Sequence, residues 1–274
     1  MKRKIIGLSL VAMLVFSMTA CGSGEESEES KEPEEIVYVD ESEIEDVFAS
    51  PEEYVGKYIK LIGNVYGGPD KGENGYYYQA WNDVENVDRD FMVQTKEKVE
   101  GVEPQGYIQV DGKIVEDFGG EEVIDSLLIE AVDLQPLTYV DAMVPTLKEI
   151  APQGAAITQN NVTVQVDKVQ YAETETRVFV TIANASDATF SPYSSLSKLV
   201  VNGQQLEIST DSMTNYYAPE LGEVPYEVLP QITASGLLVF PAIDQNTSFQ
   251  FYMEGMSDNW ELEFQPFNII IPAQ

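Results

Sequence analysis

Four carboxylates that lie close together in the sequence are the first residues whose type and spacing could do chemistry. They are Asp83, Glu85, Asp88 and Asp90, and they fall in one predicted loop. Oxygen ligands on a flexible loop suit Ca²⁺. The spacing does not match the EF-hand loop, which also requires a central glycine. A calcium site is therefore one hypothesis, and a loop of solvated charges is the one that we favour.

An aromatic run precedes these carboxylates. Tyr76, Tyr78 and Trp81 lie in one strand-like segment, and alternation places Tyr76 and Tyr78 on the face opposite Tyr77. One interpretation is a platform on which a sugar ring stacks. The other, which we favour, is packing in the core and at the rim of a barrel, since tyrosine is common in strands.

The residue types needed for most catalytic sites are missing. The chain has no histidine, and its one cysteine is Cys21. Ser-His-Asp and Cys-His sites and histidine-ligated zinc are therefore excluded, and no dinucleotide or P-loop motif is present. A glycosidase needs only two carboxylates, but 47 acidic residues make some suitable pair inevitable. We therefore expect a protein that is not an enzyme and holds no cofactor.

The residues before Cys21 follow the pattern of a secretory signal. Lys2, Arg3 and Lys4 are basic, residues 5–16 are apolar and uncharged, and small residues precede Cys21. The apolar run is shorter than the roughly 20 residues of a membrane span.

The segment Met18-Thr19-Ala20-Cys21 resembles the lipobox of bacterial lipoproteins, with Met18 in place of the usual leucine. The resemblance implies a diacylglycerol thioether on Cys21 and removal of residues 1–20 as a signal peptide. More than one acyl chain on a residue is enough for stable anchoring. We therefore expect an anchor in the lipid bilayer, on the extracytoplasmic face of the cell membrane. An ordinary signal peptide with a chance cysteine is the alternative.

The chain is strongly acidic. Its formal net charge is −32, and removing residues 1–20, which hold three basic and no acidic residues, leaves −35. Such a surface repels phosphates, so we expect no nucleic-acid partner. Twelve acidic residues and only Lys31 as a basic one lie between Glu25 and Asp46. Residues 21–41 are therefore predicted to form a disordered, extended tether. Its role is a spacer or, alternatively, a tail that recruits a partner.

The first folded domain is predicted over residues 42–137. Ser42 and Glu45 fit a capping box, and a short helix follows that ends before Pro51. Apolar alternation then predicts five strands, which a small barrel would close. Their ranges are 58–66, 75–82, 91–95, 107–116 and 126–134.

This domain resembles the OB-fold-like domains of small bacterial exported proteins. The resemblance is carried by SPEEYVGKYIKLIGNV at 50–65, GYIQVDGKIVED at 106–117 and LLIEAVDLQPL at 127–137. Many OB folds bind oligonucleotides or oligosaccharides. Nucleic-acid binding is not expected here, because it needs a basic groove.

The second folded domain is predicted over residues 156–274, after a linker at 138–155 with a helical turn at 145–150. Its strands include an irregularity near Asp167 and a hairpin turn at Asn202-Gly203. Seven or eight strands indicate an antiparallel sandwich without a disulfide.

This half resembles the telokin-like, immunoglobulin-type domain of unknown function at the C-terminus of Gram-positive lipoproteins. The carrying segments are VTVQVDKVQYA at 162–172, VFVTIANASD at 178–187 and LPQITASGLLVFPAI at 229–243. The resemblance implies a fold and no activity.

The sequence thus predicts an all-β chain: a short N-terminal helix, a small OB-like barrel and an antiparallel immunoglobulin-like β-sandwich. The favoured function is a monomeric, membrane-anchored, non-catalytic binding or interaction module of the cell envelope, whose partner is an envelope protein or a glycan. The alternatives are a structural or inhibitory envelope protein and a carboxylate-dependent hydrolase.

Overall fold

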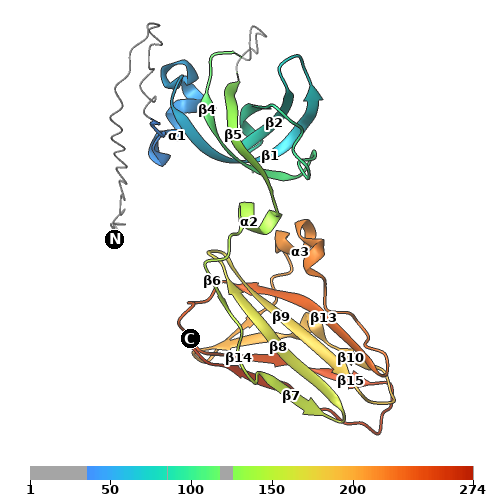
Figure 1. Ribbon diagram of the computed structural model, residues 1–274. Helices are drawn as coiled ribbons and strands as arrows, with labels where there is room; N and C mark the ends of the chain where they lie inside the picture. The colour runs from blue at the N-terminus through green and yellow to red at the C-terminus, as the bar shows by residue number, and fades with distance from the viewer. Residues whose placement is uncertain (1–35, 85, 118–125, 274) are drawn as a thin grey trace, which may run out of the picture. The chain divides into compact units, whose positions relative to one another are not determined.

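The computed structural model describes residues 36–84, 86–117 and 126–273 (Figure 1). The predicted signal peptide, Cys21 and Glu85 lie outside these residues. Strands dominate the described chain, as the sequence predicts. No helix in these three ranges is long and apolar enough to cross a membrane.

Five strands form a closed barrel in the order β1-β2-β3-β5-β4. The pair β3/β5 is parallel and the other pairs are antiparallel. Closure leaves no open sheet edge, and the five-stranded OB-like barrel predicted from the sequence is confirmed. Its strands are β1 (Tyr58–Lys71), β2 (Tyr76–Asp83), β3 (Asp88–Thr95), β4 (Tyr107–Ile114) and β5 (Leu127–Leu137).

The alternation of β1 points its apolar residues into the barrel. Ile59, Leu61 and Val65 are buried, and the residues between them are more exposed. Gly63 lies on the same inward face, where a Cβ atom would come within 2.7 Å of the Phe91 ring. The absence of a side chain at Gly63 therefore makes room for Phe91, which is fully buried in the barrel core.

The predicted N-terminal helix is present as α1 (Ile44–Ala49), and it ends before Pro51 as expected. The predicted capping box is wrong by two residues. Asp40 and Glu43 form it around a 3₁₀ turn, with the Ser42 N–H donating to Asp40 at 3.0 Å. The Ser42 hydroxyl itself donates to Asp40, so it is not the capping acceptor. Val47 of α1 is fully buried in the barrel core.

The end of the predicted tether belongs to the barrel. The Val39 N–H donates to the Tyr58 carbonyl, and the Tyr58 N–H donates to the Val37 carbonyl, both at 2.8 Å. The Tyr38 hydroxyl donates to Asp111 on β4 at 2.9 Å. This short β-branched and aromatic run has the residue types that pair well beside a strand, so residues 37–39 belong to the barrel domain and not to the tether.

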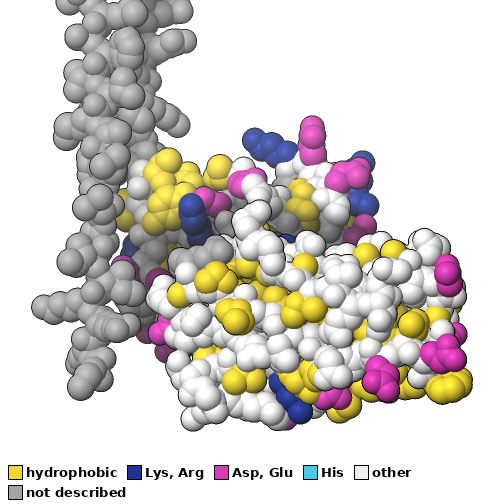
Figure 2. Space-filling view, turned by 90° about the horizontal axis from the view of Figure 1, so that it is seen from below, with side chains coloured by type: hydrophobic (Ala, Val, Ile, Leu, Met, Phe, Trp, Pro, Cys, Tyr) yellow, Lys and Arg dark blue, Asp and Glu magenta, His cyan; other side chains and the backbone are white. Residues whose placement is uncertain are grey.

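The remaining strands form the predicted sandwich. One sheet has the order β13-β9-β8-β6, with β7 also on β8; the other has the order β12-β11-β14-β16, and β10 pairs with β15. Side chains from both sheets form a single core. Figure 2 shows a face of the sandwich on which Lys and Arg are sparse. The strands are β6 (Lys148–Ile150), β7 (Ala156–Gln159), β8 (Val162–Tyr171), β9 (Glu175–Asn184), β10 (Phe190–Pro192), β11 (Lys198–Val201), β12 (Gln204–Glu207), β13 (Ile232–Pro241), β14 (Phe249–Met253), β15 (Gly255–Ser257) and β16 (Phe267–Ile271).

Two local predictions for the sandwich are confirmed. The register of β8 against β9 shifts between Val166 and Lys168, which is the irregularity expected near Asp167. Asn202 and Gly203 have φ values of 51° and 79° between β11 and β12, as a type I′ hairpin turn requires.

The prediction of a helical turn at 145–150 is wrong. The helix α2 (Tyr139–Met143) comes earlier, and β6 pairs with β8, where Ile150 lies opposite Val169. Three residues are too few to show a period-two pattern, so the sequence does not indicate this strand. A further short helix, α3 (Met213–Tyr217), was not predicted.

Candidate functional site

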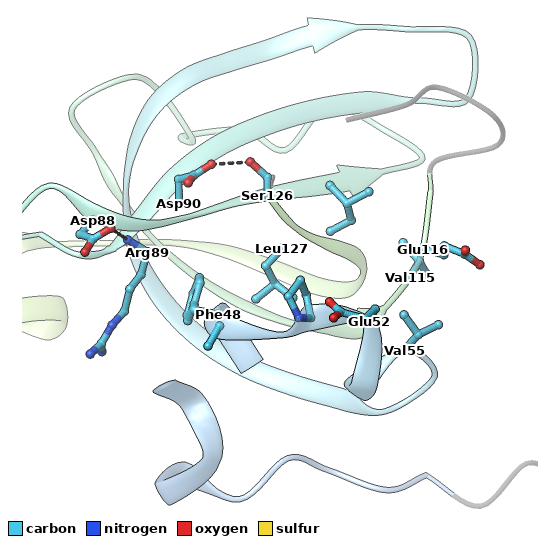
Figure 3. Close-up of a pocket in the computed structure, with 13 residues that line it drawn as sticks. Phe48, Glu52, Val55, Asp88, Arg89, Asp90, Val115, Glu116, Ser126 and Leu127 are labelled. Atoms are coloured by element: carbon cyan, nitrogen blue, oxygen red, sulfur yellow. Dashed lines mark hydrogen bonds between the residues drawn. The ribbon is translucent and has the colours of Figure 1, made fainter. Parts of the chain in front are cut away.

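A cavity of about 690 Å³ opens on the barrel between α1 and the first residues of β3 and β5 (Figure 3). Segments far apart in the sequence meet here, because β3 and β5 run parallel and start at the same end of the barrel. The residues that line the cavity are Phe48, Ala49, Pro51, Glu52, Val55, Asp88, Arg89, Asp90, Val115, Glu116, Ser126, Leu127 and Leu128.

The floor of the cavity is apolar. Phe48 of α1 lies beside Leu127 of β5 in the middle of Figure 3. Leu127 is part of the barrel core, and Phe48 packs against that core. Val115 and Leu128 extend the apolar surface. Leu127 and Leu128 are buried, so the accessible apolar surface of the floor comes from Phe48 and Val115, which are half-buried.

The rim of the cavity carries four carboxylates, from Glu52, Asp88, Asp90 and Glu116. Asp90 accepts a hydrogen bond from the Ser126 hydroxyl, drawn as a dashed line in Figure 3. Asp88 accepts from the Arg89 N–H at 2.8 Å. The carboxylates of Glu52 and Glu116 are exposed and take no hydrogen bond or ion pair from any described residue. These two acceptors are available to a ligand.

Arg89 is the single cation among the described residues that line the cavity. Its Nη2 atom lies 2.9 Å from Glu45 Oε1, and its side chain extends away from the middle of the cavity in Figure 3. Its backbone has a φ of 58°, and Val87 nearby has a φ of 55°, a conformation that non-glycine residues seldom adopt. Because Arg89 is already paired with Glu45, the rim keeps its negative charge.

The predicted calcium ligands divide between two places. Asp88 and Asp90 line the cavity, whereas Asp83 accepts from the N–H and the side-chain amide of Asn86 at 3.1 and 3.0 Å. Glu85 lies outside the described residues. The described chain contains no group of three or more His, Cys, Asp or Glu side chains placed to hold a metal ion. Among the described residues, Asp83 is therefore not brought together with Asp88 and Asp90 at the cavity, and the calcium hypothesis stays a prediction.

The predicted aromatic platform is not assembled. Tyr78 is fully buried in the barrel core and its hydroxyl accepts from the Val99 N–H at 2.8 Å, so the prediction that it stacks on a ligand is wrong. Tyr76 is half-buried against the same core. Trp81 stacks on Tyr66 with 4.1 Å between ring centroids, which covers one face of the indole. Burial, and then the charge of Asp90, raise the pKa of Tyr66.

Sequence reasoning missed Glu52 and Glu116. They are far apart in the chain, and nothing in their spacing indicates that they share a cavity. The acidic cluster at 83–90 was the available signal, and of its three described carboxylates Asp88 and Asp90 line the cavity and Asp83 does not.

No family model matches the chain, and no curated protein matches it. Among solved structures, a functionally unknown protein from Listeria monocytogenes EGD-e is 12% identical, with a TM-score of 0.34. That match covers 48% of this chain and 88% of the other. The yjhA protein from Bacillus subtilis is 14% identical, with a TM-score of 0.29, and the match covers 36% and 77% of the two chains. Neither description names a ligand or an activity.

Proposed function

We propose that this protein is a non-catalytic binding module of the cell envelope, anchored through Cys21, whose barrel cavity takes a basic side chain of a partner protein. The observation that carries the proposal is the pair of exposed carboxylates, Glu52 and Glu116, which take no hydrogen bond from any described residue and line the cavity with the half-buried Phe48 and Val115. Lysine and arginine combine an apolar stem with a cationic head. Such a side chain can lay its stem on the floor and place its head between the carboxylates.

The overall charge supports a basic partner. A chain of net charge −32 attracts cationic surfaces and speeds their encounter. The cavity then determines where on the barrel the basic side chain binds. Arg89, the cation on its rim, is already paired with Glu45, so the rim stays attractive to a cation. The partner that fits is an envelope protein with an exposed lysine- or arginine-rich segment.

The N-terminal residues support the location. The lipobox-like Met18-Thr19-Ala20-Cys21 and the acidic segment after it suit a tethered lipoprotein of a Gram-positive bacterium. The telokin-like resemblance of the second domain agrees with this assignment. In this proposal the tether determines the distance of the barrel from the membrane, and the cavity determines which side chain of the partner the barrel binds.

The test must separate the cavity from general charge attraction. A fluorescent peptide of alternating lysine and leucine is titrated against the full lipidated chain in nanodiscs, at about 0.15 M salt, and anisotropy is measured. The double variant Glu52→Gln/Glu116→Gln is compared with Glu100→Gln/Glu103→Gln, which removes the same charge from exposed positions outside the cavity.

We expect the cavity variant to bind about tenfold more weakly, which corresponds to about 1.4 kcal/mol. The control variant should stay within about twofold, because salt screens exposed charges beyond about 8 Å. Equal losses in both variants would show that only net charge attracts the peptide, and the proposal would then fail.

A further inference from the structure

We propose that a second cavity, of about 620 Å³ at one end of the sandwich, binds an uncharged saccharide. It lies where β8 begins and β9 ends (Figure 1). Four loops contribute to it: the β7–β8 turn, the loop after β9, the segment before β13 and the loop after β15. The lining residues are Asn160, Asn161, Ser186, Asp187, Ala188, Thr189, Pro230, Asp258, Asn259 and Leu262.

A buried amide holds these loops in place. Asn184 is 1% exposed and donates to the carbonyls of Ala188 and Val228, each at 2.8 Å. Its carbonyl oxygen accepts from both the N–H and the hydroxyl of Ser186. The Gln231 amide reaches back to the Ser186 carbonyl at 3.0 Å. The cavity is therefore preorganised, which reduces the entropy cost of binding.

The cavity presents planar amide and carboxylate groups to solvent. In the part of the chain that the structure describes, the Asp187 carboxylate and the Asn161 side-chain amide take no hydrogen bond. Asp258 uses Oδ1 to accept from the Thr189 N–H at 2.9 Å. Each sugar hydroxyl is both a donor and an acceptor, so adjacent hydroxyls can pair with a carboxylate or amide edge.

An exposed indole follows Asn259, a residue that lines the cavity, in the chain. The Leu262 N–H donates to the Asn259 carbonyl at 3.0 Å, and this closes a turn whose central residues are Trp260 and Glu261. Trp260 is 84% exposed, and the residues at both ends of its turn line the cavity. Indole offers a flat apolar face and one N–H donor. The apolar face of a pyranose ring can stack on it while its hydroxyls reach Asp187 and Asn161.

The charge around the cavity selects an uncharged ligand. Its described lining contains two aspartates and no Lys or Arg, which disfavours phosphate, sulfate and uronate groups. A metal ion is not favoured either, because the described residues contain no group of three acidic side chains placed to hold one.

This inference does not depend on the barrel cavity. The two cavities share no lining residue, so a failure of peptide binding leaves the saccharide proposal standing, and the reverse also holds.

The test uses the full lipidated chain in nanodiscs and isothermal titration calorimetry. The probes are chitotetraose, cellotetraose and maltotetraose, with dextran sulfate and Ca²⁺ titrated separately. The variants are Trp260→Ala and Asp187→Asn. The matched control is Tyr216→Ala, which removes an aromatic residue that is 76% exposed and lies on α3. That helix contacts Glu175 through Thr214, at the opposite end of β9 from Asn184.

We expect saturable binding of at least one neutral tetrasaccharide. Trp260→Ala and Asp187→Asn should each weaken it about tenfold or more, which is about 1.4 kcal/mol, and Tyr216→Ala should leave it within about twofold. The proposal is overturned if no neutral tetrasaccharide binds, if both cavity variants bind like the unmodified chain, or if Ca²⁺ or dextran sulfate is the ligand that saturates the site.

Discussion

The buried ion pair between Arg177 and Glu175 makes a sharp prediction about the stability of the sandwich. Arg177 is fully buried on β9, and its Nε atom lies 3.3 Å from Glu175 Oε1. Glu175 also accepts from the hydroxyls of Ser212 and Thr214 at 3.0 and 2.7 Å. Burial lowers the pKa of Arg177, and the charge of Glu175 opposes that shift. The carboxylate of Glu175 is therefore the main group that makes the buried charge tolerable.

The perturbation is Glu175→Gln, which keeps the shape and removes the charge. Breaking a buried pair by removing one partner costs about 3–5 kcal/mol, because the other charge stays buried and uncompensated. We take the lower end, about 3 kcal/mol, since the glutamine carbonyl can still accept from Thr214. The guanidinium is poorly compensated at the outset, because its Nε and Nη1 atoms have no hydrogen-bond partner among the described residues and only Nη2 donates, to the Val144 carbonyl at 2.7 Å. At about 4 °C per kcal/mol, the sandwich should melt about 12 °C lower.

The double variant Glu175→Gln/Arg177→Met separates the charge from the packing. With neither charge buried, much of the loss should be recovered, so the effects of the two single changes should not add. Differential scanning calorimetry of the full chain measures all variants. Glu173→Gln is the control, since this exposed carboxylate lies in the turn before β9 and its change should cost less than about 0.5 kcal/mol. A loss below about 1 kcal/mol for Glu175→Gln, or strict additivity in the cycle, would refute the reasoning.

Three further predictions concern the anchor, the loop end of the sandwich and strand β6. Replacing Cys21 with Ser should move the protein from the membrane fraction to the medium in cell fractionation, and retention on the membrane would contradict lipid anchoring. Asn184→Ala should destabilise the sandwich by about 2 kcal/mol in urea unfolding, because the buried carbonyls that it satisfies lose their donor; a loss within error would show that the loops do not depend on it. The Gln170 amide, and then Lys168, lower the pKa of Glu149 on β6, so its contribution to stability is present above its ordinary pKa and is lost as the pH falls through the lowered one. In an NMR titration, Gln170→Ala should raise the pKa of Glu149, and an unchanged pKa would contradict this account.

Much of the fold could be predicted because its signals are local. Ile59, Leu61 and Val65 alternate along β1, and this pattern alone indicates which face is buried. Asn202-Gly203 likewise has a backbone preference that holds in almost any context. The strand β6 could not be predicted from its own residues. Lys148 and Ile150 belong to a strand only because they pair with Tyr171 and Val169 of β8, and this pairing joins separate segments of the chain.

The candidate site was predicted only in part. The acidic run drew attention to Asp88 and Asp90, which line the barrel cavity. The same reasoning offered Tyr78 as a ligand-stacking residue, and the barrel buries it completely. Alternation shows that Tyr76 and Tyr78 share a face, but it cannot tell which of the two lies deeper, because depth depends on where the other strands close the barrel.

By itself, the sequence determined the all-β class and the five barrel strands, because alternation and turn residues act within a few positions of the chain. Only the tertiary structure decided that Glu52 and Glu116 lie on the rim of one cavity, and that Asp187 and Asn259 line another. These sites are made by strand register and by packing between distant segments. Such contacts are settled by the whole core together, and no short stretch of sequence contains them.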